Sequence, residues 1–91
     1  MNLHEIGYID HLPKLDIHGV DAKSAEMYIK DFIEEQYNLK NEYIVIMHGI
    51  GQGILLKTTK KVLEKHDLVK DFKNLFQNRG CTVIHLKIRE K

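Results

Sequence analysis

The chain has 91 residues, of which 43% are hydrophobic and 30% are charged, a composition typical of one small globular domain and not of a disordered chain. A single cysteine, Cys81, excludes an internal disulfide, and no apolar stretch is long enough to cross a membrane. The first residues also lack the basic and then apolar pattern of a signal peptide. We therefore expect a cytoplasmic protein with no membrane partner.

Charge is distributed unevenly along the chain, although its net value is only +1. Residues 1–47 hold four Lys and nine Asp or Glu, a net −5, whereas residues 48–91 hold ten Lys or Arg and four Asp or Glu, a net +6. A basic half of this kind favours a surface for a polyanion such as nucleic acid, although exposed lysines also serve simply to keep a small domain in solution.

The first predicted element is a short strand over residues 14–17, after an N-terminal arm of residues 1–13 that ends at the only proline. Leu15 and Ile17 should face the core. Asp16 and His18 alternate with them, so these two polar residues should be neighbours on the opposite face. Residues 14–91 are expected to form one domain.

A helix should follow, with Asp21 as its N-terminal cap. Residues 43–47 then form an uninterrupted, β-branched apolar run that is typical of a central strand. The core-facing residues of the helix recur at helical spacing: Ala22, Ala25, Ile29, Phe32, Ile33 and Gln36.

The basic half predicts a second helix over residues 54–66, followed by strands over residues 68–75 and 81–88 that are joined by a turn at residues 77–80. In the last strand, three residues should face the core and three the other side. The first set is Ile84, Leu86 and Ile88, and the second is Val83, His85 and Lys87.

The element order β-α-β-α-β-β predicts an α/β fold, a two-layer open-faced sandwich in which two helices cover one face of a four-stranded mixed sheet. The strands at residues 14–17 and 43–47 should be parallel because a helix connects them. Their carboxyl ends would then bring Asp16, His18 and His48 to one edge of the sheet, where open α/β sheets place their ligands.

Three glycines precede the second helix at alternate positions: Gly49, Gly51 and Gly53. Because they lack side chains, successive backbone amides can face an anion near the positive end of the helix, and phosphate is the natural ligand. The spacing matches neither a dinucleotide-binding fingerprint nor a P-loop, since Lys57 does not directly follow the last glycine.

The acid and the histidines suit several kinds of chemistry. Asp16 could act as a general base, orient an imidazole or bind a metal, and His18 or His48 could protonate a leaving oxygen or neutralise a phosphate. Alternatively, Asp16 and His18 cap a turn, and His48 satisfies backbone groups of its loop. The spacing does not match a zinc site, so no cofactor is assigned, but the three residues would allow a labile divalent metal ion.

The paired motifs Leu15-Asp16-Ile17-His18-Gly19 and His48-Gly49-Ile50-Gly51-Gln52-Gly53 together resemble the signature of the small MutS-related (Smr) domain. The resemblance runs from about residue 14 to residue 88. It implies an α/β sandwich similar to the C-terminal domain of a bacterial translation initiation factor, and nucleic-acid endonuclease activity. It also implies that Asp16 and His18 are the central catalytic pair and that His48 with Gly49, Gly51 and Gly53 binds the substrate backbone.

The resemblance also bears on partners and on the phosphate contacts. Some similar proteins act on messenger RNA at stalled ribosomes, which would make the ribosome a partner. The chain departs from the family pattern at Ile50, where members often have a basic residue, and at Leu56, where they often have an arginine. Lys57 is then the nearest cation to the glycine loop.

The leading hypothesis is therefore an endonuclease that cleaves phosphodiester bonds of RNA or DNA at Asp16 and His18. In it, His48 and the loop amides stabilise the transition state, while Lys57, His85 and Lys87 bind the substrate. One alternative is a non-catalytic module that binds nucleic acid or a ribosome-associated protein, and another is an interaction domain with structural histidines. The sequence does not specify RNA over DNA, metal dependence or the oligomeric state.

Overall fold

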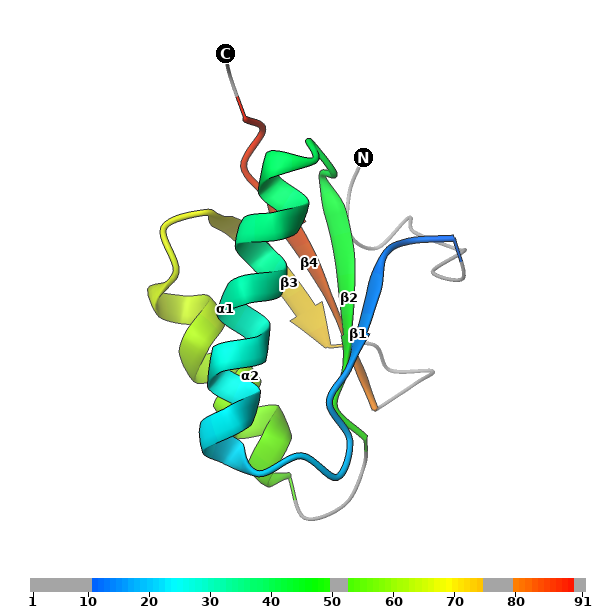
Figure 1. Ribbon diagram of the computed structural model, residues 1–91, viewed down its shortest axis with the longest axis vertical. Coiled ribbons are helices and arrows are strands. Elements are labelled where there is room, and N and C mark those ends of the chain that lie inside the picture. Colours follow the sequence, from blue (N-terminus) through cyan, green and yellow to red (C-terminus); the bar gives the residue numbers. More distant parts are fainter. Residues whose placement is uncertain (1–10, 50–52, 75–79, 90–91) are drawn as a thin grey trace.

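A computed structural model describes residues 11–49, 53–74 and 80–89, and its elements follow the predicted order (Figure 1). The strands form one sheet in the order β1-β2-β4-β3, parallel between β1 and β2 and antiparallel in the other two pairs. Both helices lie side by side on one face of this sheet (Figure 1). The predicted two-layer β-α-β-α-β-β fold is therefore confirmed. The elements are β1 (Lys14–Asp16), α1 (Ala22–Asn38), β2 (Tyr43–Met47), α2 (Ile54–Lys65), β3 (Val69–Asn74) and β4 (Cys81–Leu86).

The two helices begin and face the sheet as their sequences predict. Asp21 caps α1 by accepting a hydrogen bond from the Ser24 amide at 3.0 Å, and this bond holds the pKa of Asp21 below its ordinary value. Among the described residues, neither helix is long and apolar enough to cross a membrane. The residues that the helices bury are Ala25, Ile29, Ile33 and Gln36 of α1 and Thr59, Val62 and Leu63 of α2.

The main core lies between the helices and the sheet, and it is built from alternate residues of the central strands. Ile44 and Ile46 of β2 and Ile84 and Leu86 of β4 are fully buried on this side. Ile17, which directly follows β1, is also fully buried there. This alternation decides which neighbouring polar residues point toward the helices and which point away from them.

The face of the sheet that the helices leave uncovered is less open than predicted. Val83, expected there beside His85 and Lys87, is fully buried and packs with Val45 and Cys81. Leu12, near the end of the predicted arm, packs against this cluster, and residues 1–10 of that arm lie outside the described residues. The centre of this face is therefore apolar and closed.

The last strand is shorter than predicted. It ends at Leu86, and Ile88, expected to face the core, is 66% exposed. The cause is that β2 begins at Tyr43, so the β2–β4 ladder ends where the Leu86 amide donates to the Glu42 carbonyl at 2.8 Å. The apolar alternation continues beyond the sheet on which it would pack. Of the predicted turn at residues 77–80, only the last residue lies within the described residues.

Candidate active site

The carboxyl ends of β1 and β2 meet at one edge of the sheet, as parallel pairing predicts. Asp16 pairs in register with Met47, and the Ile17 amide donates to the Met47 carbonyl at 2.9 Å. The residues that follow are in contact, because a Cβ added to Gly49 would lie 3.2 Å from the Cβ of His18. This edge, formed by Asp16, His18, His48 and Gly49, is called the rim below.

Asp16 and His18 form a hydrogen-bonded pair on the rim. Oδ1 of Asp16 accepts the backbone N–H of His18 at 3.1 Å and lies 2.5 Å from Nδ1 of its ring. Because a carboxylate accepts, Nδ1 carries the proton, and Nε2 is the outward nitrogen of the ring. The side chains are 50% exposed for Asp16 and 73% exposed for His18, so a substrate can reach both.

The same contact fixes the charge of the carboxyl group. The hydrogen bond from the His18 ring, followed by that from the His18 amide, lowers the pKa of Asp16 below its ordinary value. The carboxylate is therefore ionised at neutral pH. An ionised carboxylate that holds Nδ1–H orients the imidazole and leaves Nε2 able to accept a proton.

His48 shares the rim but not its exposure, because the residue is only 3% exposed. Its Nδ1 lies 2.9 Å from the Gly49 carbonyl, which can only accept, so Nδ1 carries the proton. Its Nε2 then accepts the hydroxyl of Thr82 at 2.9 Å. Both ring nitrogens are thus engaged inside the protein. His48 follows Ile44 and Ile46 at alternate positions of the chain, so its imidazole points toward the helices as their side chains do.

Gly49 lies where backbones and side chains approach closely. Its φ is +81°, in the left-handed region, and its amide donates to the Gly80 carbonyl at 3.1 Å. A Cβ added to Gly80 would in turn lie 3.3 Å from Cα of Gly49. The His48 amide also donates to the Gly80 carbonyl, at 2.8 Å. These two loop amides therefore hold the loop to the start of β4 and do not point at a ligand.

The amino end of α2 retains the backbone donors that the glycine pattern predicts. Gly53 is its N-cap residue, with a φ of +81° and no side-chain cap, and the first turn of the helix contains no acidic residue. Because the first intrahelical bond runs from the Lys57 amide to the Gly53 carbonyl, the amides of residues 54–56 have no acceptor within the helix. This is the electrostatic arrangement in which helices bind phosphate.

The other predicted substrate-binding residues are divided between two regions. Lys57 is exposed one turn into α2, while Gly51 lies outside the described residues. His85 pairs in register with Tyr43, at the amino end of β2, so it is four residues or about 13 Å along the strand from the rim. The exposed Lys87 follows β4 at that same far end. The structure therefore does not bring His85 and Lys87 to the rim.

A divalent metal ion would find few protein ligands at the rim. Asp16 and His18 can supply one carboxylate and one imidazole, whereas His48 has both nitrogens engaged. Within residues 11–49, 53–74 and 80–89, no three His, Cys, Asp or Glu side chains form a group that could hold a metal. An ion bound by the pair would take its remaining ligands from water or from substrate phosphate, as Mg²⁺ commonly does.

Sequence reasoning missed two residues that shape the rim, Gly80 and Thr82. Gly80 was assigned to a hairpin turn, yet its carbonyl accepts both loop amides. Thr82 lies on the same side of β4 as Ile84 and Leu86 and is 1% exposed. A hydroxyl at a core-facing position of an apolar strand requires a buried partner, and that requirement was the available signal.

Comparison with known proteins agrees with the paired motifs. The model of the Smr domain matches residues 15–87. The chain belongs to the Smr domain family. Among curated relatives, Endonuclease MutS2 of Aquifex aeolicus is 31% identical over 80 residues, which is 85% of this chain but 10% of that protein. Endonuclease MutS2 of Alkaliphilus oremlandii is 27% identical over 77 residues. This Smr domain thus spans about a tenth of the length of these relatives.

Two solved structures share the fold of this Smr domain. The Smr domain of Thermus thermophilus MutS2 superposes with a TM-score of 0.81 at 23% identity, over 84% of this chain and 99% of that one. YdaL, a stand-alone small MutS-related protein from Escherichia coli, superposes with a TM-score of 0.80 at 16% identity, over 89% of this chain and 69% of that one. At these identities the likeness concerns the fold alone.

Proposed function

We propose that this Smr domain is an endonuclease that cleaves phosphodiester bonds of nucleic acid at the rim. The observation that carries the proposal is the exposed Asp16–His18 pair, in which an ionised carboxylate holds Nδ1–H and turns Nε2 outward. Membership of the Smr family and the names of the MutS2 relatives, which are endonucleases, support the same reaction class.

In this proposal, His18 is the general base. Its Nε2 accepts the proton of the attacking hydroxyl, either water or a ribose 2′-OH, while that oxygen forms a bond to phosphorus. The bond from phosphorus to the leaving sugar oxygen then breaks, and the leaving oxygen takes up a proton from solvent. Asp16 keeps the ring in the required tautomer and stabilises the imidazolium that forms. The imidazolium finally returns its proton to solvent.

The amino end of α2 is proposed to hold the reacting phosphate. The amides of residues 54–56 lack intrahelical acceptors, and the positive end of the helix favours an anion. Lys57 adds a charge one turn further along. These groups would stabilise the negative charge that grows on the phosphoryl oxygens in the transition state.

His48 is proposed to act as a positioning residue and not as an acid or base. Its bonds to the Gly49 carbonyl and the Thr82 hydroxyl hold the loop against β4, and Gly49 in turn contacts His18. In this role His48 fixes the distance between the catalytic pair and the glycine loop. The sequence-based hypothesis of a catalytic His48 is therefore replaced by one in which it acts through its neighbours.

The test is cleavage of end-labelled single- and double-stranded RNA and DNA by the purified chain. We expect Asp16→Asn and His18→Ala to lower cleavage strongly, by about 10²-fold or more for His18→Ala, while circular dichroism shows an unchanged fold. The matched control is Asp31→Asn, which removes an exposed carboxylate from the solvent side of α1 and should cleave like the wild type. Retained cleavage by the Asp16 variant would refute the assignment.

Two further arms separate the remaining hypotheses. Chelator in the reaction tests whether a divalent ion assists the pair, and analysis of the product termini distinguishes attack by water from attack by a ribose hydroxyl. Salt-sensitive binding of all four substrates without cleavage by the wild type would instead identify the non-catalytic binding module.

A further inference from the structure

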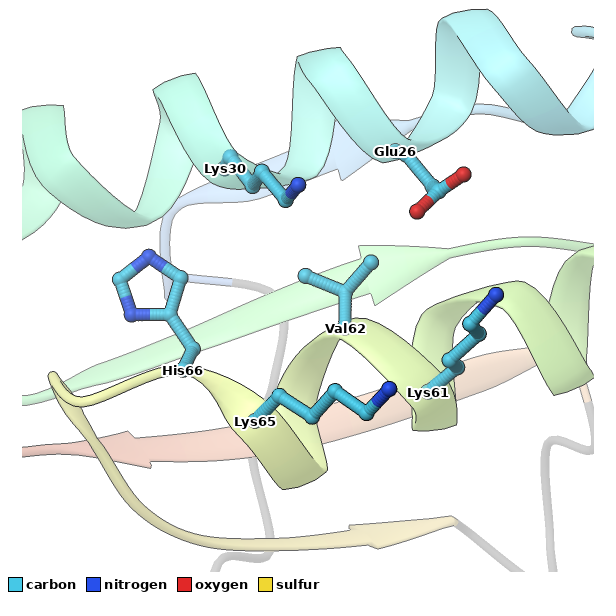
Figure 2. Close-up of a pocket in the computed structure, with 6 residues that line it drawn as sticks. All are labelled: Glu26, Lys30, Lys61, Val62, Lys65 and His66. Carbon is cyan, nitrogen blue, oxygen red and sulfur yellow. The ribbon is translucent and has the colours of Figure 1, made fainter.

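A groove of about 320 Å³ runs between the two helices, outside the rim. It is lined by a mixture of charged residues and one apolar residue, which are Glu26, Lys30, Lys61, Val62, Lys65 and His66. Figure 2 shows Glu26 and Lys30 projecting from α1, Lys61, Val62 and Lys65 projecting from α2, and His66 directly after the end of α2. Val62 is 5% exposed and forms the apolar floor. These six residues are called the interhelical groove.

The interhelical groove has an excess of positive charge. Three lysines, Lys30, Lys61 and Lys65, line it together with a single acidic residue, Glu26. Within the described part of the chain, none of these three ammonium groups is ion-paired. Their charges are therefore available to an external anion, and their mutual repulsion would fall when one binds.

His66 adds a hydrogen-bond donor whose direction is fixed. The Leu68 amide donates to Nδ1 of His66 at 3.2 Å, so Nδ1 of the neutral ring is unprotonated and Nε2 carries the hydrogen. The ring points from the end of α2 toward α1 (Figure 2). Among the described residues, Nε2–H has no acceptor. An anion oxygen in the groove would provide one.

The lysines of α2 connect the groove with the amino end of that helix. Lys57, Lys61 and Lys65 recur every four residues and are all exposed, so they form a row on one side of the helix that spans about 12 Å. The row starts one turn after Gly53, and both helices begin at the end of the molecule where β1 and β2 finish (Figure 1). A strand whose phosphate is held at the amino end of α2 can therefore continue along the groove.

We propose that the interhelical groove binds the phosphate backbone of the substrate strand beyond the phosphate that is cleaved, so that the nucleic acid crosses the helical layer. This inference rests on the proposed function. A row of evenly spaced cations with one apolar side chain suits a ligand with repeating charge, whereas a protein segment requires larger apolar anchors. The opposite face of the sheet has a closed apolar centre, and its His85 is bonded to Glu42.

The test measures binding of fluorescent single-stranded oligonucleotides of about 5 and about 15 nucleotides, a range that covers typical site sizes, in an Asp16→Asn background that prevents cleavage. We expect Lys61→Gln/Lys65→Gln to weaken binding of the long oligonucleotide and to reduce its salt slope by about 1.4, since each phosphate contact contributes about 0.7. The matched control is Lys60→Gln/Lys70→Gln, which removes the same charge from exposed lysines outside the groove and should leave the slope unchanged.

A neutral variant separates the hydrogen bond from the charges. His66→Asn places an acceptor oxygen near the position of Nδ1, so it can keep the Leu68 bond while it removes the Nε2 donor. We expect it to weaken binding of the long oligonucleotide by about two- to tenfold, the effect of one neutral hydrogen bond, with no change in salt slope. A changed slope, or unchanged affinity, would contradict this role of His66.

The outcomes for the groove and for the proposed function are distinguishable. Equal salt slopes for Lys61→Gln/Lys65→Gln and Lys60→Gln/Lys70→Gln would contradict binding of nucleic acid in the groove. Cleavage of the short oligonucleotide, measured with Asp16 intact, would still support the nuclease. Polyglutamate that binds as tightly as the long oligonucleotide, and with the same loss in Lys61→Gln/Lys65→Gln, overturns the nucleic-acid assignment. Absence of salt-sensitive binding by the parent chain overturns both proposals.

Discussion

Two carboxylate–imidazole pairs lie at opposite ends of the sheet, and their difference shows what makes one of them a candidate site. Asp16 and His18 are 2.5 Å apart at the rim, with side chains 50% and 73% exposed. Glu42 and His85 are 2.7 Å apart at the far end, where the side chain of His85 is only 14% exposed. The short contact is common to both pairs, so its length does not distinguish them, whereas access to solvent does.

The two pairs also differ in which ring nitrogen is engaged. Asp16 holds Nδ1 and leaves the outer Nε2 of His18 to solvent, whereas Glu42 holds Nε2 of His85. The ring of His85 is further fixed by stacking on Tyr43, with centroids 4.5 Å apart and planes 12° from parallel. The far pair therefore links β4 to the residue before β2, while the rim pair presents a proton acceptor.

The largest expected effect comes from truncating the two histidines in parallel. His18→Ala should lower single-turnover cleavage by on the order of 10²–10⁴-fold, the contribution of a general base. His85→Ala should leave cleavage per folded molecule unchanged but lower the free energy of unfolding by about 1–2 kcal/mol, because a stacked and hydrogen-bonded ring is lost. Equal losses of cleavage in both variants would remove the distinction between the two ends.

A third histidine sharpens the comparison, because His48 is at the rim but buried. His48→Ala should lower the free energy of unfolding by about 2–4 kcal/mol, since it removes two hydrogen bonds, leaves the Thr82 hydroxyl unpaired and opens a cavity. Urea denaturation measures this loss.

Thr82→Val provides the control for that prediction. It removes the partner of His48 without touching the exposed part of the rim, so its effect on stability should be non-additive with that of His48→Ala. Cleavage per folded molecule by Thr82→Val should remain within a few fold of the wild type. If Thr82→Val lost cleavage as completely as His18→Ala, the result would contradict a purely positioning role and support a catalytic role for His48.

The local sequence pattern was sufficient to predict the element order, the buried faces of both helices and the meeting of the two motifs at one edge of the sheet. A helix between two strands makes them parallel, and this rule alone brought Asp16 near His48. Alternation also implied the burial of His48, which has the parity of Ile44 and Ile46, although it was interpreted as a loop residue.

Features that depend on contacts between residues far apart in the sequence could not be predicted from the local sequence pattern. The Gly49 amide is occupied by the carbonyl of Gly80, a residue 31 positions later, so its predicted role toward a ligand could not be judged from the motif. His85 and Lys87 were placed on an open face, but their distance from the rim follows from the register of β4 on β2. The interhelical groove likewise requires the packing of α1 against α2.

Two glycines with the same backbone conformation allow a smaller effect at the rim to be isolated. Gly49→Ala and Gly53→Ala both place a side chain at a φ of +81°, which should cost about 1–2 kcal/mol of stability in each. Only at Gly49 does the added Cβ meet His18, at 3.2 Å, whereas at Gly53 none of the described residues lies within 4 Å. Gly49→Ala should therefore also lower cleavage, by less than about 10²-fold, because His18 moves by a fraction of an ångström.

The two measurements on the glycine variants answer different questions. Denaturation midpoints should fall similarly in both, which shows that the backbone strain is matched. Single-turnover rates at saturating enzyme should fall more in Gly49→Ala, and equal rates in the two variants would show that the contact with His18 is unimportant for cleavage.

The smallest expected effect is the pH dependence of stability that Asp16 contributes. The pKa of Asp16 in the folded chain is lowered from its ordinary value of 3.8 by the hydrogen bonds from His18, so the folded state favours the ionised form. The stabilisation is therefore complete above pH 3.8 and is lost as the pH falls through the lowered pKa. Because the carboxylate is half exposed, solvent and salt screen its interaction, and the effect should be modest.

Urea denaturation of the wild type and Asp16→Asn should give curves of unfolding free energy against pH that differ by a constant amount at neutral and mildly acidic pH and converge below pH 3.8. A difference that grows toward low pH would mean that the carboxyl group is favoured in its protonated form, and Asp16 could then not hold Nδ1–H of His18 as the rim requires.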